Sequence, residues 1–214
     1  MNVYYRLVIW AFERFYHEGA WTYDLVAWLI SRGYWSRWIE AVMPDLAHMP
    51  MLELGCGTGY LQRARQQESC LSVGLDESRH MLRLARRKAP RATFMRAVSQ
   101  DLPFSDASWM AIVATFPAPY LFDQATLSEI RRVLNPDGTL YIVDGGVVPD
   151  GWYQKLVTLI YWLVFGRTVS TTPDQNLTDP RMQRLAEFGF VVTSEWRNVG
   201  ASQVQILRAK VVSV

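Results

Sequence analysis

Short apolar runs alternate with amphipathic segments through most of the chain. The apolar runs cover residues 51–54, 71–76, 92–97, 109–114 and 139–143, and helical spacing of apolar positions marks 60–65 and 127–134 between them. Two further strand patterns, 191–196 and 203–210, follow a helical pattern at 182–190. Strands that alternate with helices indicate βαβ units and a mainly parallel sheet. The pattern therefore predicts a doubly wound α/β fold with seven strands.

Residues 1–48 form a different region, rich in aromatic side chains at helical spacing. Helical patterns run over residues 4–15, 23–30 and 35–42, with breaks expected at Gly19 and Gly33 and a stop at Pro44. One interpretation is that these helices pack against the sheet. The other is that they form a cap, which either lines an apolar pocket or lies at a membrane interface, where Trp and Tyr are favoured. We expect a helical cap over 1–48 and a main domain over 49–214.

A second unusual stretch, residues 151–167, is predicted to be a helical insertion in the main domain. It is apolar almost all round a helix, and Lys155 and Arg167 are its only charged side chains. The stretch is too short to span a bilayer unaided, which takes roughly 18–20 apolar residues. Three interpretations stay open: a core helix, a lid over an apolar substrate, or a helix at a membrane interface.

Composition narrows the range of partners. The 214 residues carry a formal net charge of only +2 and are 50% hydrophobic, so the broad cationic field of a nucleic-acid-binding protein is missing. Cys56 and Cys70 have no metal-binding spacing, and no metal site is expected. The amino terminus lacks the pattern of a signal peptide, and we expect a cytoplasmic protein.

The strongest local signal is the run Met51-Leu52-Glu53-Leu54-Gly55-Cys56-Gly57-Thr58-Gly59. It predicts a strand, a tight turn and the start of a helix, with glycines that let the backbone adopt positive φ and let a ligand approach. Glu53, near the strand end, can accept hydrogen bonds from a cationic ligand group. In the dinucleotide fingerprint G-x-G-x-x-G the third glycine would fall at position 60, where this chain has Tyr60. The alternative is a tight turn that binds no ligand.

Asp76 ends the next predicted strand, 17 residues beyond Gly59. A carboxylate there can accept hydrogen bonds from both hydroxyls of a ribose, and the alternative is a solvated side chain. Ser78 is expected to cap the following helix. That helix carries several arginines and Lys88. The cations at its C-terminus are interpreted as offsetting the helix dipole and the rest as a solvated face, rather than as a site for an anionic partner.

Four segments together resemble one enzyme family. The glycine run resembles the first motif of the class I S-adenosylmethionine-dependent methyltransferases. The run Gln100-Asp101-Leu102-Pro103-Phe104 and the Asn135-Pro136-Asp137-Gly138 turn resemble segments of its ubiquinone/menaquinone-type members, and residues 16–24 are similar to their entry segment. The resemblance implies a Rossmann-like, seven-stranded mixed sheet with an antiparallel last strand, and S-adenosyl-L-methionine as the cofactor.

The resemblance and the local chemistry assign candidate residues to the cofactor. The entry tyrosines, the glycine motif, the strand-end acids, the residues around Asp101 and the end of the fourth strand are expected to surround it. The candidates are Tyr16, Tyr23, Glu53, Gly55, Cys56, Gly57, Gly59, Asp76, Glu77, Met81, Gln100, Asp101, Leu102, Thr115 and Phe116. Asp101 is expected to accept from the adenine amino group, and Met81 to cover the adenine ring.

The acceptor side is less defined. Thr115-Phe116-Pro117-Ala118-Pro119-Tyr120 lacks the Asp or Asn with which some methyltransferases hold an amine or base, and this argues against methylation of nucleobases. His17, Asp144 and Asp123 are candidate bases without a motif behind them. We expect methyl transfer to a small lipophilic acceptor, quinone-like or lipid-like, with contact to a membrane surface. The alternatives are a non-catalytic S-adenosylmethionine-binding module and an NAD(P)-dependent oxidoreductase, which the Asp101 segment and Tyr60 disfavour.

Overall fold

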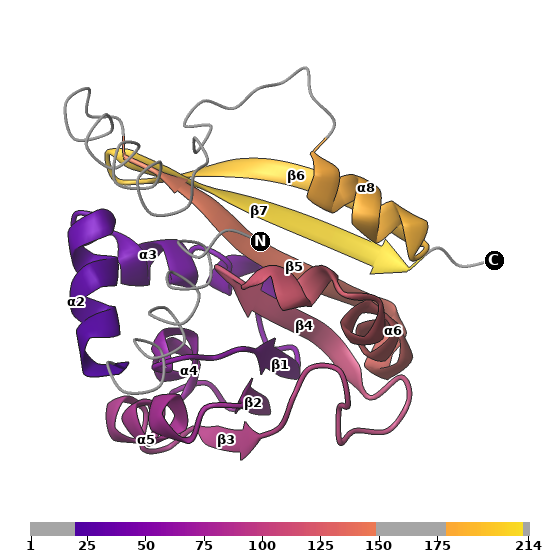
Figure 1. Ribbon diagram of the computed structural model, residues 1–214, viewed down its shortest axis with the longest axis horizontal. Helices are drawn as coiled ribbons and strands as arrows, with labels where there is room; N and C mark the ends of the chain where they lie inside the picture. Colours follow the sequence, from indigo (N-terminus) through magenta and orange to yellow (C-terminus); the bar gives the residue numbers. More distant parts are fainter. Residues whose placement is uncertain (1–19, 149–178, 212–214) are drawn as a thin grey trace, which may run out of the picture.

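A computed structural model describes residues 20–148 and 179–211, and its centre is one twisted sheet of seven strands (Figure 1). The strands are β1 (Met51–Leu54), β2 (Ser72–Asp76), β3 (Thr93–Arg96), β4 (Trp109–Thr115), β5 (Leu134–Val147), β6 (Phe190–Val199) and β7 (Ser202–Val211). Their order is β3-β2-β1-β4-β5-β7-β6. Strands β1 to β5 pair in parallel, and β7 pairs antiparallel with both β5 and β6. The predicted seven-stranded mixed sheet with an antiparallel last strand is confirmed.

Helices cover both faces of this sheet. They are α2 (Ala20–Ile30), α3 (Trp35–Glu40), η1 (Met43–Leu46), α4 (Tyr60–Arg65), α5 (Arg79–Lys88), η2 (Pro119–Phe122), α6 (Gln124–Val133) and α8 (Pro180–Glu187). Alternate residues of β4 build the two hydrophobic cores: Ile112 and Ala114 face α6 and α8, while Ala111 and Val113 face α3 and α4. The sheet therefore lies between two packed layers of helix.

The predicted helices of the amino-terminal region are present where the structure describes it. The α2 and α3 helices match the second and third patterns, Gly33 has the positive φ of a helix break, and Pro44 lies in η1 just after α3. Trp38 of α3 is buried in the core and donates from Nε1 to Ser202 Oγ at 2.9 Å. The first predicted helix, over residues 4–15, and the insertion 151–167 lie outside the described residues.

The Asn135–Gly138 segment is a bulge within β5 rather than a turn between elements. Trp109 pairs with Leu134 and Ala111 with Thr139, so four residues of β5 stand opposite one residue of β4. Asn135 Oδ1 accepts from the backbone N–H of Asp137 at 3.0 Å, the short-range bond that makes such Asx turns. The expected turn chemistry is correct, but the sheet continues through it.

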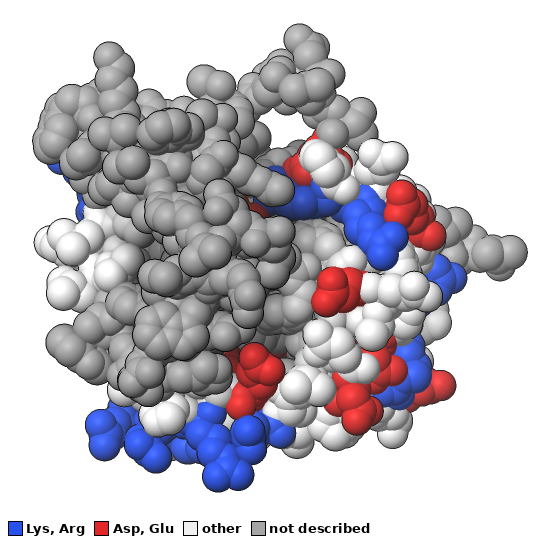
Figure 2. Space-filling model, viewed as in Figure 1, with Lys and Arg blue, Asp and Glu red and all other residues white. Residues whose placement is uncertain are grey.

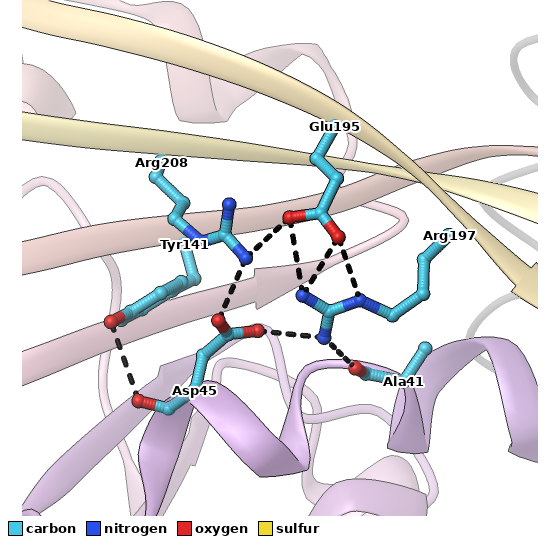
Figure 3. A network of polar contacts seen from close by, with 6 residues as sticks. All are labelled: Ala41, Asp45, Tyr141, Glu195, Arg197 and Arg208. Atoms are coloured by element: carbon cyan, nitrogen blue, oxygen red, sulfur yellow. Dashed lines mark hydrogen bonds and ion pairs between the residues drawn. The ribbon is translucent and has the colours of Figure 1, made fainter.

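A network of charges fastens the amino-terminal helices to the last two strands (Figure 3). Asp45 of η1 forms ion pairs with Arg197 of β6 and Arg208 of β7, both at 2.8 Å, and Glu195 binds the same two arginines. The Tyr141 hydroxyl also donates to the backbone carbonyl of Asp45 at 3.4 Å. The two ion pairs of Asp45 join residues more than 150 positions apart in the sequence.

Candidate cofactor and acceptor site

The glycine loop between β1 and α4 has the shape of a ligand cradle. Gly55, Gly57 and Gly59 have φ of +65°, +51° and +82°, a region that side chains disfavour. A Cβ at Gly59 would lie 2.9 Å from the Cβ of Ala85 on α5, so this glycine is needed for packing. A Cβ at Gly57 would meet nothing within 4 Å. The open space above Gly57 is where a ligand can approach the backbone.

Cys56, inside this loop, has a structural position. Its N–H donates to the carbonyl of Leu75 at 2.9 Å, and its side chain is buried. Burial, with the nearby charges of Glu53 and Asp76, raises the pKa of the thiol well above its usual value. A thiol of this kind stays protonated and is no nucleophile, so Cys56 can contribute to ligand binding through its backbone.

Asp76 joins the glycine loop to β2 and to the start of α5. Its side chain is almost fully buried, and its two carboxylate oxygens accept from the N–H of Gly57 at 2.9 Å and of Ser78 at 2.8 Å. Each carboxylate oxygen can accept a second hydrogen bond, so these contacts are compatible with binding ribose hydroxyls. Ser78 caps α5 as expected, because its Oγ accepts from the N–H of Met81 at 3.3 Å.

Glu53 is a buried acid beneath the loop. Its carboxylate is 1% exposed and accepts from Gln62 Nε2 at 3.0 Å and from Thr115 Oγ1 at 3.4 Å. Burial raises the pKa of Glu53 to about 8. The negative charge of Asp76 also raises this pKa, and the hydrogen bonds from Gln62 and Thr115 oppose the rise. The group is therefore protonated at neutral pH until a nearby positive charge favours its ionised form.

A polar cluster that the sequence analysis missed holds α2 against the glycine loop. Lys88 Nζ contacts Asp24 of α2 at 2.7 Å and Thr58 of the loop at 2.9 Å, and lies 3.5 Å from the centre of the Tyr60 ring. Thr58 also donates to Asp24 at 2.7 Å. Lys88 lies in the last turn of α5, as the helix-dipole interpretation expects, and it also forms this cluster, which the sequence analysis did not foresee. Burial lowers the pKa of Lys88 despite the opposing effect of Asp24.

Tyr23, the expected entry tyrosine, precedes Asp24 on α2. The Lys88 cluster therefore fixes the helix that carries Tyr23 to the glycine loop. Only the backbone of Tyr23 is described, within α2, and Tyr16 and His17 lie outside the described residues. The signal for Asp24 was present in the entry segment, where it follows that tyrosine. Lys88 had no such signal, because its neighbours on α5 are exposed arginines.

The loop that contains Asp101 is held from the side of α6. Glu129 Oε2 accepts from the N–H of Leu102 at 2.8 Å, and Arg132 donates to the carbonyls of Leu102 and Phe104 at 2.9 and 2.8 Å. Leu102 is buried, whereas Asp101 and its neighbour Gln100 are exposed. The exposed carboxylate is thus presented on a fixed loop, which suits the adenine contact expected of it.

Tyr120 of η2 is a second residue that the sequence analysis missed. Its hydroxyl would clash with a Cβ at Gly55, and it forms a hydrogen bond with Ser99. Burial, with the charge of Asp76, raises the pKa of Tyr120 to about 12. The side chain therefore joins the glycine loop, the end of β2 and the Asp101 loop. Tyr120 is the last residue of the segment that begins at Thr115. Its place in that segment was the only sequence signal for a role at the site.

The carboxyl end of β4 carries an aromatic wall, formed by Trp35, Trp38 and Phe116. The Phe116 ring stacks on Trp35 at 4.3 Å between centroids and lies 6.0 Å from Trp38. Phe116 has a positive φ of 46°, and its N–H donates to Val143 at 2.7 Å. Thr115 precedes it and donates to Glu53. The wall therefore lies beside the acid under the glycine loop.

The remaining candidates differ in their partners and in their exposure. Asp144 forms an ion pair with Arg181 at 2.6 Å and accepts from the N–H of Gly145 at 2.8 Å, which makes it a poor general base. Asp123 is exposed at the start of α6, and Glu77 is exposed next to Asp76. Met81, in the first turn of α5, is fully buried. Among the described residues, no group of His, Cys, Asp and Glu side chains could hold a metal ion.

Comparisons with known proteins agree with this geometry. The profile of the Methyltransferase domain family matches residues 51–138. The demethylmenaquinone methyltransferase of Thermotoga maritima is 31% identical over 203 residues, which cover 85% of this chain and 89% of that enzyme. The demethylmenaquinone methyltransferase of Chlorobaculum tepidum is 30% identical over 156 residues; the match covers 69% of this chain and 64% of that enzyme, just under two thirds of its length.

Among solved structures, the YcgJ protein of Bacillus subtilis has a TM-score of 0.59 at 15% identity, with 83% of this chain and 99% of that chain covered. This likeness shows the fold. The open cradle at Gly57, with acids at the ends of β1 and β2, fits the cofactor of the sequence relatives. The chain belongs to the class I S-adenosylmethionine-dependent methyltransferases, in the ubiquinone/menaquinone-type family.

Proposed function

We propose that this protein transfers a methyl group from S-adenosylmethionine to a small lipophilic acceptor, quinone-like or lipid-like. The observation that carries the proposal is the half-buried stacked pair of Trp35 and Phe116, which lies beside Thr115 and Glu53 and packs on the buried Trp38. Flat aromatic surface next to a cofactor cradle suits a flat, apolar acceptor. The names of the demethylmenaquinone methyltransferases support the same class of acceptor.

The mechanism that this site supports is an in-line displacement that depends on positioning. When bound, S-adenosylmethionine supplies an electrophilic methyl group on a positively charged sulfur. Asp76 and the Gly57 backbone hold the nucleoside side, and Glu53 offers a negative charge beneath the loop. The half-buried rings of Trp35 and Phe116 orient the acceptor, and the buried Trp38 supports them from the core. Fixed orientation of two reactants can account for about 7–11 kcal/mol of a barrier.

The proposal needs no strong base from the protein. Asp144 is held by Arg181, and Asp123 is exposed at the start of α6. An acidic phenol or a reduced quinone can lose its proton to solvent before transfer. The site therefore fits acceptors that ionise readily, and fits poorly an acceptor such as an unactivated alcohol, which requires a base at the reacting oxygen.

We also propose that α2 touches a membrane surface from which such an acceptor is taken. Leu25, Trp28 and Leu29 expose more than half of their surface on one side of α2. Burial of apolar surface contributes ~25 cal/mol per Å². No helix among the described residues is long and apolar enough to cross a membrane. The contact is therefore proposed to be peripheral.

The acceptor is tested with methyl-labelled S-adenosylmethionine and a fractionated lipid and quinone extract. We expect label in the organic phase with the wild type, and less of it with Asp76→Ala at limiting S-adenosylmethionine, because this variant weakens cofactor binding. Label found only in polar acceptors would contradict a lipophilic substrate. Cofactor binding without any turnover would indicate a non-catalytic binding module.

The membrane contact is tested by sedimentation with uncharged phosphatidylcholine vesicles. We expect Trp28→Gln to reduce the bound fraction, whereas Val191→Gln, at an exposed apolar position of β6, leaves it unchanged. Equal sedimentation of the wild type and Trp28→Gln would overturn the contact through α2, and methyl transfer would be unaffected by that result.

A further inference from the structure

A hollow lined by arginines lies between α5 and the edge strand β3, apart from the aromatic wall. Its volume is about 570 Å³, and its walls are Arg79, Leu82, Arg83, Arg86, Arg87 and Arg96. Figure 2 shows basic side chains gathered along the lower edge of the molecule, where Figure 1 places α5 and β3. One hollow therefore concentrates five positive charges in a chain whose net charge is only +2.

These five arginines have no carboxylate partner among the described residues. Arg96 Nε donates to the carbonyl of Glu77 at 2.9 Å and Arg86 Nη2 to that of Phe94 at 3.5 Å, and no ion pair joins any of the five to a described carboxylate. Six other described arginines, Arg65, Arg132, Arg181, Arg184, Arg197 and Arg208, each form an ion pair with an acid. Arg37, Arg63, Arg91 and Arg131 form none with a described carboxylate, but they do not line a common hollow, as these five do. The hollow therefore keeps its full positive charge.

A solvated helix face does not account for this arrangement. Cations in the last turn of a helix offset its dipole, and that reason applies to Arg86 and Arg87. It does not apply to Arg79, the first residue of α5, where the dipole disfavours a positive charge. Arg79 and Arg83 are also four residues apart, a spacing at which like charges repel. Arg96 adds a further charge from β3.

We propose that this hollow binds a ligand that carries phosphate groups. The guanidinium group is planar and always charged, and it donates two parallel hydrogen bonds to a phosphate. Arginines from a helix and from a facing strand can contact one phosphate group from two sides, or two adjacent groups at once. The phosphates can belong to lipid headgroups of a membrane or to a soluble phosphate compound. The proposal does not depend on the identity of the methyl acceptor.

Two probes separate the sources of phosphate: inorganic pyrophosphate in calorimetry, and vesicles that contain phosphatidylglycerol compared with vesicles of phosphatidylcholine alone. The test variant is Arg83→Gln/Arg86→Gln. The control is Arg37→Gln/Arg63→Gln, which removes the same charge from exposed positions on α3 and α4. We expect the test variant to weaken binding of at least one probe more than tenfold, and the control to change it less than threefold.

The pattern of binding identifies the source and can overturn the proposal. A preference for phosphatidylglycerol vesicles without pyrophosphate binding assigns lipid headgroups, and pyrophosphate binding alone assigns a soluble compound. Equal weakening in the test and control variants would show that binding depends on net charge and not on the hollow, and this would overturn the proposal. Binding of neither probe would also overturn it. S-adenosylmethionine affinity should be unchanged in the test variant, and its loss would make the hollow part of the cofactor site instead.

Discussion

A buried carboxyl group such as Glu53 ionises only when a nearby charge compensates for the water it has lost. Burial raises its pKa to about 8, so it binds a proton at neutral pH. The sulfonium and ammonium groups of S-adenosylmethionine are positive charges of the kind that favour its ionised form. Cofactor binding near Glu53 should therefore release a proton.

We predict that S-adenosylmethionine binds more tightly as the pH rises from 6 to 8, with release of protons that Glu53→Gln abolishes. Calorimetry in two buffers of different ionisation enthalpy measures the protons released. Because the ligand's own amino group also titrates near pH 8, the relevant quantity is the difference between the wild type and the variant. Identical proton release by both would show that Glu53 does not ionise on binding.

Asp76 contributes to both the loop and the ligand, and two substitutions separate these contributions. We predict that Asp76→Ala weakens S-adenosylmethionine binding by about 1–3 kcal/mol, because it removes acceptors for the ribose hydroxyls. It should also lower the melting temperature, since the N–H groups of Gly57 and Ser78 lose their partner. Asp76→Asn retains one acceptor oxygen and should be less destabilising. Unchanged affinity in Asp76→Ala would refute the ribose assignment.

At the scale of elements, the turn from β1 to α4 contains two glycines with different functions. We predict that Gly57→Ala folds with a loss of roughly 1 kcal/mol from its positive φ and binds the cofactor poorly. Gly59→Ala should be much less stable, because its Cβ would press on Ala85 of α5. Thermal melts and binding isotherms of the two variants test this difference. Equal stability of the two, or normal cofactor binding by Gly57→Ala, would contradict it.

The α2 helix is held to the glycine loop by the Lys88 cluster, and the contact should be separable from folding. We predict that Asp24→Asn weakens the ion pair with Lys88 and speeds hydrogen exchange in α2, while exchange in β4 and β5 stays slow. If Tyr23 contributes to the cofactor site, affinity falls in parallel. Exchange in α2 as slow as in the wild type would show that apolar packing alone fixes this helix.

The strands were predictable from the sequence because buried parallel strands are continuous apolar runs. The Asn135–Gly138 bulge was recognisable as turn chemistry, yet no local pattern shows that the sheet passes through it. The cluster around Lys88 was not predictable, because its arginine neighbours on α5 are exposed and the contact with Asp24 comes from the packing of α2. Tyr120 and the acid–arginine partners of the Asp101 loop depend on contacts between distant elements, which periodicity does not report.

At the scale of the whole molecule, the Asp45 network joins the amino-terminal helices to the carboxyl-terminal strands. Burial alone would raise the pKa of Asp45, but hydrogen bonds and charges of Arg197 and Arg208 outweigh it and lower the pKa. Hydrogen bonds from the same arginines lower the pKa of Glu195. A carboxyl group whose pKa is lower in the folded state stabilises the fold above its unfolded pKa, and this contribution is lost as the pH falls through the folded pKa.

We predict that Asp45→Asn lowers the free energy of unfolding at pH 7 by roughly 1–3 kcal/mol, because two partly buried arginines lose their shared carboxylate. The difference between variant and wild type should shrink as the pH falls below about 4, the ordinary range of an aspartate, since protonation then removes the same charge from the wild type. Urea unfolding at several pH values measures it. Asp137→Asn, at an exposed position of the β5 bulge, is the matched control and should have little effect at any pH. A destabilisation by Asp45→Asn that stays constant down to pH 3 would show that shape rather than charge holds the amino-terminal helices to β6 and β7.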